Sequence, residues 1–224
     1  RLIMGCNEET GSRCMQHYNK VAEELSCGFT PDANFPCIHG EKGQVTMTAH
    51  SQNTRIISMN GGFVFNAVCD FCTTVIPAED GLKEKLEAAF SESGLIQYHL
   101  HESDGLIQID AKGVSAHASM PALGVNAAGV TFACLAKAGF EDDFVRFYNS
   151  HIGTACDGSG LDLKFQDAYG DLTLCNGIVK TENGEISCTI DIRFPVTLST
   201  EQICTMCQNR LEDSDGYIEI QNLT

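Results

Sequence analysis

The sequence predicts an α+β fold in which antiparallel sheets are backed by helices. Runs rich in Val, Ile, Thr and Phe alternate in mixed order with stretches of helical spacing, without a regular strand–helix repeat. Two turn signals, at residues 103–105 and 181–184, lie between apolar runs and predict hairpins, which join antiparallel strands. Of the 224 residues, 43% are hydrophobic and 20% are charged, which is typical of a globular chain.

Residues 1–42 predict a strand–helix–extended unit of the kind found in α/β layers. Residues 1–6 are expected to form a short buried strand that leads into an acidic turn. Residues 15–25 have helical spacing, and Pro31 and Pro36 break the pattern that follows. The polar, glycine-bearing segment 40–43 is the expected boundary to the rest of the chain.

From residue 44 onward the pattern predicts strands interspersed with helices. The expected strands are 45–50, 63–76, 94–101, 106–114, 172–179, 186–194 and 217–220. The expected helices are one that begins at 77–80, with Leu82, Leu86 and Ala89 on one face, and others at 124–138, 141–149 and 199–211. Ser199 and Gln202 have the spacing of a capping box, and the glycine-rich segment 151–170 predicts a loop.

The charge of the chain excludes two classes of partner. There are 30 acidic and 14 basic residues, which give a formal net charge of −16. Such a surface repels the phosphates of nucleic acids and the anionic face of a membrane. No apolar run approaches the roughly 20 residues that span a bilayer. We therefore expect neither nucleic acid nor membrane as a partner.

Twelve cysteines raise the question of disulfides or metal. Cys69 and Cys72 form one C-x-x-C pair, but they lie in an expected strand, where residues three apart point to opposite faces. Cys204 and Cys207 form another pair on an expected helix, with no His nearby. We expect reduced cysteines that serve as small apolar residues, and hence a cytoplasmic protein.

Two acidic segments are candidates for metal chemistry. Glu8 and Glu9 are adjacent carboxylates on a turn, where one can ligate a metal while the other takes a proton from bound water. The alternative is a solvated acidic turn that is favourable at a helix N-terminus. Asp32 follows a proline, in a stiffened segment that suits a ligand of fixed geometry. Its alternative is an ordinary Asx-turn residue.

Three further residues could contact a ligand. His117 lies among small residues before Pro121 and can reach out of the fold, although a lone His is commonly a surface or satisfied core residue. Arg193, near a strand end, suits the bidentate capture of a carboxylate, with an internal salt bridge as its alternative. Asn66 follows two glycines at the start of an expected strand, where an ordinary strand-edge role is the alternative.

Together and in this order, these segments resemble the M20 family of zinc metallopeptidases, and within it the PepV- and carnosinase-like dipeptidases. The segments that carry the resemblance are Glu-Glu-Thr-Gly-Ser at 8–12, Phe-Thr-Pro-Asp-Ala-Asn-Phe-Pro at 29–36, Ser-Ala-His-Ala-Ser-Met-Pro at 115–121 with Gly-Val-Asn-Ala at 124–127, and Asp-Ile-Arg-Phe-Pro at 191–195. They extend over nearly the whole chain.

The resemblance implies a peptide-bond hydrolase with two zinc ions in the complete enzyme and a dipeptide or small peptide as substrate. Glu8 would be the general base, and Glu9 and Asp32 would be zinc ligands. Asn66 and His117 would hold the substrate, with His117 polarising the scissile carbonyl. Arg193 would bind the free C-terminal carboxylate.

The resemblance also implies a division of the chain. Residues 1–42 would be a fragment of an α/β catalytic domain, and 43–224 a lid with two ferredoxin-like lobes, at about 43–114 and 115–224. The family's His-x-Asp zinc motif precedes the segment equivalent to Glu8, and its last zinc-binding His follows the lid. Neither is present, so we expect a chain that holds little or no zinc and is inactive alone.

Two other functions stay open. One is an N-acyl amino acid deacetylase or desuccinylase on the same scaffold. The other is a non-catalytic lid-like module for binding or dimerisation. The length of 43–224 suits two lobes in one chain, so we expect a monomer, with a dimer through the lid as the alternative.

Overall fold

The computed structural model describes residues 2–6, 12–31, 36, 38 and 40–211, and the backbone of 217–223. The chain divides into two compact units, residues 1–40 and 41–224.

The first unit contains a helix, α1 (Arg13–Val21), close to the predicted position. The buried strand expected at residues 1–6 is wrong, since residues 2–6 have no strand structure and Leu2 and Met4 are more than four-fifths exposed. A strand needs a neighbour to pair its backbone groups, and the described residues of this unit supply none.

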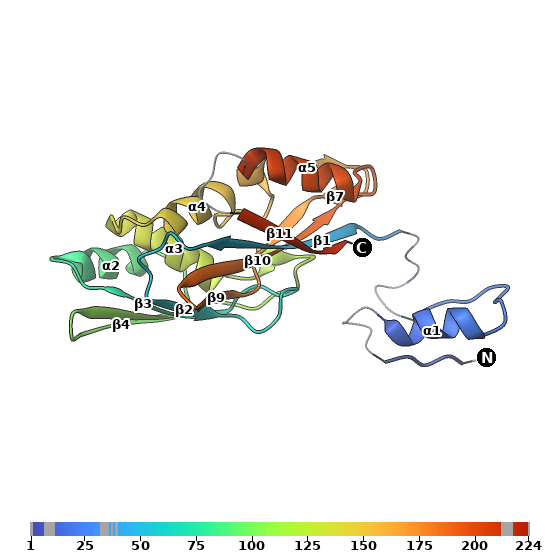
Figure 1. The fold of residues 1–224 in the computed structure, drawn as a ribbon, viewed down its shortest axis with the longest axis horizontal. Helices are drawn as coiled ribbons and strands as arrows, with labels where there is room; N and C mark the ends of the chain where they lie inside the picture. Colours follow the sequence, from blue (N-terminus) through green and yellow to red (C-terminus); the bar gives the residue numbers. More distant parts are fainter. Residues whose placement is uncertain are drawn as a thin grey trace. The chain divides into compact units, whose positions relative to one another are not determined.

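The second unit is built on an antiparallel sheet (Figure 1). Its hydrogen-bonded order is β11-β1-β10-β9-β2-β3-β5-β4, and β8 also pairs with β10. The strands are β1 (Gly43–Ser51), β2 (Ser58–Gly61), β3 (Phe71–Pro77), β4 (Gln97–Ser103), β5 (Leu106–Lys112), β8 (Thr173–Cys175), β9 (Val179–Glu182), β10 (Glu185–Phe194) and β11 (Tyr217–Leu223). The short strands β6 (Gln166–Asp167) and β7 (Gly170–Asp171) pair with each other. The prediction of an α+β fold with antiparallel sheets is confirmed.

The two predicted turns join adjacent strands as expected. Asp104 and Gly105 connect β4 to β5, and Asn183 and Gly184 connect β9 to β10. All four residues have positive φ angles, between 53° and 78°. This is the backbone of the two-residue turns whose twist matches that of the strands they join.

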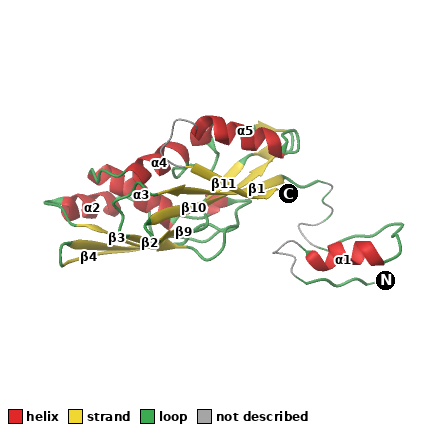
Figure 2. Cartoon of the chain, in the orientation of Figure 1, coloured by secondary structure: helices red, strands yellow, loops and turns green. Residues whose placement is uncertain are grey.

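The helices lie on one side of the sheet (Figure 2). They are α2 (Leu82–Ser91), α3 (Ala127–Ala138), α4 (Asp143–His151) and α5 (Thr200–Leu211), with single 3₁₀ turns at Pro121–Leu123 and Ser159–Leu161. The predicted capping box of α5 is present, since Ser199 N donates to Gln202 Oε1 (2.8 Å) and Gln202 N to Ser199 Oγ (3.2 Å). None of the helices in the described part of the chain is both long and apolar enough to cross a membrane.

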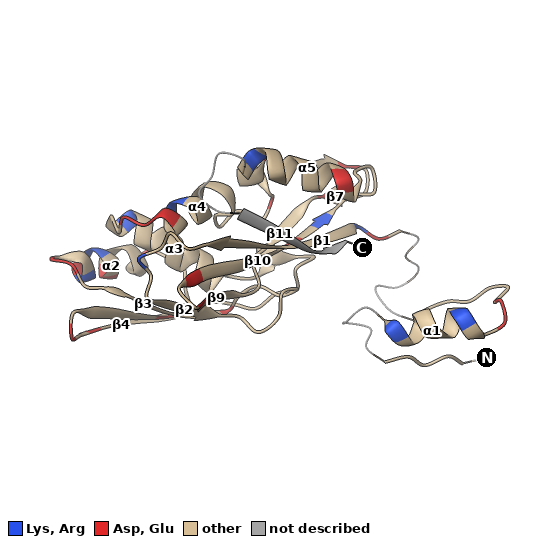
Figure 3. Ribbon diagram, in the orientation of Figure 1, with Lys and Arg blue, Asp and Glu red and all other residues tan. Residues whose placement is uncertain are grey.

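Aromatic side chains of α3 and α4 pack against one another in the core. Phe132 of α3 stacks on Tyr148 of α4 with ring centroids 4.1 Å apart. The ring centroid of Phe144, also on α4, lies 5.7 Å from that of Phe132. All three side chains are fully buried. Outside this core, acidic and basic residues are interspersed along the helices (Figure 3). Some of them form exposed ion pairs, such as Lys137 of α3 with Glu92 at the end of α2, at 2.6 Å.

The strand predicted at 63–76 begins only at Phe71, and the preceding residues form a loop. The backbone of this loop bonds to other loops, because Val68 N donates to Ala116 O and Cys69 N to Asn176 O. The strand β2, just before the loop, was missed. The strand predicted at 172–179 is likewise divided into β8 and β9.

The sheet runs without interruption across the lobe boundary expected near residue 114. Strand β1, expected in the first lobe, lies between β10 and β11, and β2 pairs with β9. The two expected lobes therefore share one sheet, so residue 114 is not a division of the strands.

Two glycines allow the 62–70 loop to lie against the chain between β8 and β9. A Cβ at Gly62 would overlap the carbonyl oxygen of Gly177, and one at Gly177 would overlap the carbonyl of Phe65. Gly62 also has a left-handed φ of 71°. Since a Cβ at either position would overlap the backbone, the close approach requires glycine at both.

Replacing Gly62 by Ala should therefore lower the free energy of unfolding by more than the strain of its left-handed φ angle accounts for. Gly81 is the matched control, because its φ is also 71° and nothing lies within 4 Å of a Cβ there. We expect Gly81→Ala to lower the free energy of unfolding by about 1 kcal/mol, and Gly62→Ala by about 3 kcal/mol. Denaturant unfolding measures both, and equal losses would contradict the close approach.

Candidate functional site

Three of the predicted site residues, Glu8, Glu9 and Asp32, lie outside the described residues. Their assignment as base and zinc ligands stays a prediction. Within the described part of the chain, no group of three or more His, Cys, Asp or Glu side chains is placed to hold a metal ion.

Asn66 and His117 lie on two loops that are joined through their backbones. Ala67 and His117 form an isolated antiparallel bridge, and Ala118 N donates to Asn66 O at 2.9 Å. Val68 N donates to Ala116 O at 2.8 Å on the other side of the bridge. The two predicted residues, which are far apart in sequence, are therefore neighbours in the fold.

The ring of His117 is exposed and oriented by its own turn. Its Nδ1 accepts a hydrogen bond from the backbone N–H of Ser119 at 3.2 Å and lies 2.8 Å from the Ser119 hydroxyl. A nitrogen that accepts a backbone N–H carries no proton, so the neutral ring has its proton on Nε2. His117 thus presents a hydrogen-bond donor to whatever approaches the loop.

Arg193 pairs with a fully buried carboxylate. Its Nε donates to Asp191 Oδ1 at 2.7 Å and its Nη2 to Asp191 Oδ2 at 3.2 Å, while Gln44 Nε2 donates to the same Oδ2 at 2.8 Å. The side chain of Arg193 is 19% exposed and that of Asp191 is 0% exposed. The internal salt bridge considered from the sequence is therefore present. A guanidinium has more N–H donors than this pair uses, so Arg193 can also bind a second carboxylate.

Strand β8 links Arg193 to the loop of His117. Thr173 lies directly opposite Arg193 in the β8–β10 register, so both side chains are on the same face. The Thr173 hydroxyl donates to the carbonyl of Ala118 at 3.3 Å. Asn66, His117 and Arg193 are therefore connected through Ala118 and Thr173. We call these three residues the candidate site.

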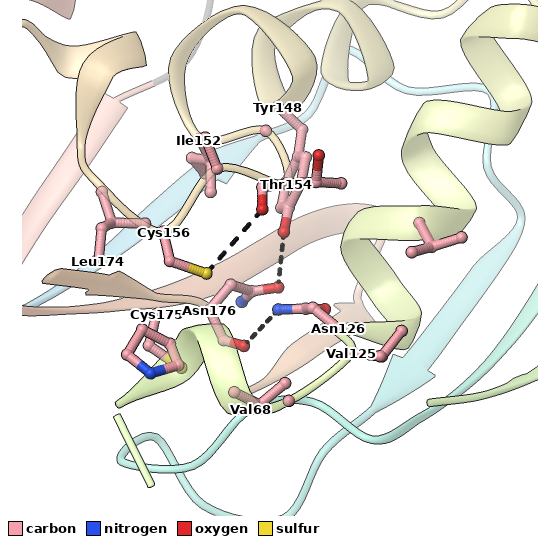
Figure 4. Close-up of a pocket in the computed structure, with 15 residues that line it drawn as sticks. Val68, Val125, Asn126, Tyr148, Ile152, Thr154, Cys156, Leu174, Cys175 and Asn176 are labelled. Atoms are coloured by element: carbon pink, nitrogen blue, oxygen red, sulfur yellow. Dashed lines mark hydrogen bonds between the residues drawn. The ribbon is translucent and has the colours of Figure 1, made fainter. Parts of the chain in front are cut away.

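A buried polar network is centred on Asn176, which follows β8 (Figure 4). Tyr148 donates its hydroxyl proton to Asn176 Oδ1 at 3.0 Å, and Asn126 Nδ2 donates to Asn176 O at 2.8 Å. Asn176 Nδ2 donates to the carbonyls of Ile178 and Thr189 at 3.0 and 2.8 Å. Burial raises the pKa of Tyr148 well above its usual value, so the hydroxyl stays a donor. The network holds the segment between β8 and β9 in position and lines a cavity of about 170 Å³.

Sequence reasoning missed the roles of Asp191, Thr173 and Asn176. Asp191 was part of a recognised segment, and its position two residues before Arg193 on a strand was the available signal. A polar Asn176 within the apolar run 172–179 was the signal for the buried network. Nothing local marked Thr173, whose contact depends on a loop 55 residues away.

The buried cysteines have the character of small apolar residues. Burial raises the pKa of Cys69, Cys175 and Cys207 to about 12 each, and that of Cys72 further. Cys69 donates its S–H to Phe71 O at 3.1 Å. These groups are therefore thiols rather than thiolates at neutral pH, in agreement with the structural use expected from the sequence.

The chain is similar in sequence to proteins named as dipeptidases. It is 26% identical over 227 residues to a protein named "Putative dipeptidase" from Staphylococcus aureus strain USA300, and 27% identical to one of the same name from the bovine strain RF122. Each alignment covers 94% of this chain and 48% of the relative, so the chain spans about half the length of the curated relatives it matches. No family model matches the chain.

Among solved structures, the aminoacylhistidine dipeptidase of Vibrio alginolyticus matches with a TM-score of 0.27 and 10% sequence identity. This match covers 82% of the present chain and 45% of that enzyme.

Removing the buried carboxylate should destabilise the protein strongly, because Arg193 would be left without its buried partner. We expect Asp191→Ala to lower the free energy of unfolding by about 3 kcal/mol. The control is Glu182→Ala, which removes an exposed pair with Lys180 and should change stability little. Chemical denaturation measures both variants. A loss at Asp191 no larger than that at Glu182 would show that the buried pair is not a stabilising contact.

Proposed function

We propose that this chain supplies the substrate-binding lid region of a zinc-dependent dipeptidase, which hydrolyses a peptide bond with metal-activated water. The observation that carries the proposal is the connection of Asn66, His117 and Arg193 through Ala118 and Thr173. Similarity to proteins named as dipeptidases over 94% of the chain supports it. Because the chain spans about half of those relatives, the activity is proposed for the whole protein.

In this proposal Arg193 binds the free C-terminal carboxylate of the peptide. Its pairing with the buried Asp191 holds the guanidinium in one orientation before the substrate arrives. Charge-assisted hydrogen bonds from a guanidinium to a carboxylate are among the stronger polar contacts. A dipeptide has few atoms with which to bind, so recognition of a charged end contributes a large part of its affinity.

His117 donates from Nε2 to the oxygen of the scissile carbonyl. The contacts of Nδ1 with Ser119 support this role, because they leave the proton on Nε2. A donor held in place where negative charge develops stabilises the transition state more than the ground state. Asn66, on the adjoining loop, is the second group that holds the substrate.

Glu8 is proposed as the general base, and Glu9 and Asp32 as zinc ligands, on the sequence segments alone. Bound zinc would lower the pKa of a coordinated water. Among the described residues, no group of three or more His, Cys, Asp or Glu side chains is placed to hold the metal.

Arg193 can be tested by whether the enzyme distinguishes a free carboxylate from an amide. We expect the whole protein to hydrolyse Ala-Leu with a kcat/KM about 100-fold above that for Ala-Leu-amide, and Arg193→Ala to remove this difference. Lys180→Ala, which removes an exposed cation in the same sheet, is the matched control and should retain it. A folded Arg193→Ala protein that still hydrolyses Ala-Leu about 100-fold better than Ala-Leu-amide would exclude the carboxylate contact.

Glu8→Gln tests the base. Turnover of Ala-Leu should fall by about 100-fold or more, because an amide cannot take the proton, whereas the zinc content should match that of the unaltered protein. Metal analysis and initial rates are measured on the same samples. Assays with N-acetyl and N-succinyl amino acids alongside Ala-Leu identify the reaction class, and a preference for the acyl amino acids would replace the dipeptidase proposal by a deacylase.

A further inference from the structure

A second and larger cavity, of about 880 Å³, lies in the same unit beside the candidate site. We call it the side groove. Its walls come from the turn that follows His117 and from three later segments of the 151–173 region. The lining residues are Met120, Pro121, Ala122, Leu123, Ala155, Cys156, Asp157, Lys164, Phe165, Gln166, Asp171, Leu172 and Thr173.

The side groove begins at residues that contact the candidate site. Met120 N donates to the carbonyl of His117 at 2.9 Å, so the groove wall is the same turn that presents the His117 ring. On the other side, Thr173 lies opposite Arg193 and bonds to Ala118. Thr173 is itself a lining residue, so the groove adjoins the strand position opposite Arg193.

The lining is mainly apolar and unusually exposed. Met120 is 57% exposed, Leu123 70% and Phe165 36%, although all three are apolar. When a ligand covers apolar side chains that are grouped in a concave surface, the removal of that surface from water favours binding. The groove is therefore suited to an apolar group.

Two ammonium groups lie at the groove. Lys164 pairs with the carboxylate of Asp157 at 3.0 Å, and Lys42 donates to the backbone carbonyl of Asp171. These two ammonium groups match the two carboxylates of the lining, Asp157 and Asp171. A substrate carboxylate placed among the apolar side chains would lose its hydration, so an acidic side chain should be disfavoured there.

The size of the groove also distinguishes it from the neighbouring cavity at Asn176. Ligand pockets commonly have volumes of about 300–1,000 Å³, and the side groove falls within this range. The cavity at Asn176, of about 170 Å³, is smaller and is lined by the buried polar network. The side groove can therefore accept even a large aromatic side chain.

We propose that the side groove binds the apolar side chain of the substrate's C-terminal residue, and so makes the enzyme prefer peptides that end in Leu or Phe. This inference rests on the proposed function, because it needs the carboxylate to bind Arg193. The groove then acts as a specificity determinant next to the carboxylate contact.

The test compares Ala-Leu, Ala-Phe, Ala-Gly and Ala-Asp as substrates of the whole protein. We expect kcat/KM for Ala-Leu and Ala-Phe to exceed that for Ala-Gly by about tenfold or more, with Ala-Asp below Ala-Gly. Leu123→Asp and Phe165→Ser should each reduce the ratio of Ala-Leu to Ala-Gly toward one. Both positions are exposed, so neither substitution should prevent folding.

Ile96→Asp is the matched control, because Ile96 is 62% exposed and is absent from the lining of the groove. It should keep the ratio of the unaltered protein. The proposal for the side groove would be overturned if the unaltered protein did not prefer Ala-Leu to Ala-Gly, or if the Leu123→Asp and Phe165→Ser variants kept that preference. Neither outcome would affect the amide comparison at Arg193. Absence of turnover with every peptide would overturn both proposals.

Discussion

The arrangement of the candidate site depends on a close backbone contact between loops that are far apart in sequence. The loop at 62–70 has no strand partner, so its polar backbone groups bond to the loops around Ala116 and Asn176. Gly62 and Gly177 permit this contact, since a Cβ on either would overlap a carbonyl group. The positions of Asn66 and His117 follow from this contact, because each lies in one of the joined loops.

The second constraint is electrostatic. Asp191 has no exposed surface, and three hydrogen bonds from Arg193 and Gln44 compensate for its burial. A buried carboxylate with these partners fixes the plane of the guanidinium, and therefore the direction in which its other donors point. The pair thus has a structural role, and in the proposed function it also orients the guanidinium for the substrate carboxylate. Thr173 connects it to the His117 loop.

Much of the fold could be predicted because its signals are local. The turns at Asp104–Gly105 and Asn183–Gly184 and the capping box of Ser199 and Gln202 each depend on residues within four positions of one another. The prediction failed where hydrogen bonds to distant segments outweighed the local preference for a strand. The run 63–76 has the composition of a strand, but its first part bonds to distant loops, and β2 was too short to give a periodic signal.

The sequence by itself determined which functional groups the candidate site contains: an imidazole, an amide and a guanidinium, each in a segment that also resembles a dipeptidase motif. It also determined the order of most helices and strands from residue 41 onward. Only the tertiary structure decided that Asn66, His117 and Arg193 are connected through Ala118 and Thr173, that Asp191 is the partner of Arg193, and that an apolar groove lies beside Thr173. The physical reason differs between them. The loop contacts and the walls of the groove join segments that are far apart in sequence, and such contacts leave no periodic trace in either segment. Asp191 and Arg193 are close in sequence, but only the packing of the whole unit buries the carboxylate and so makes the guanidinium its necessary partner.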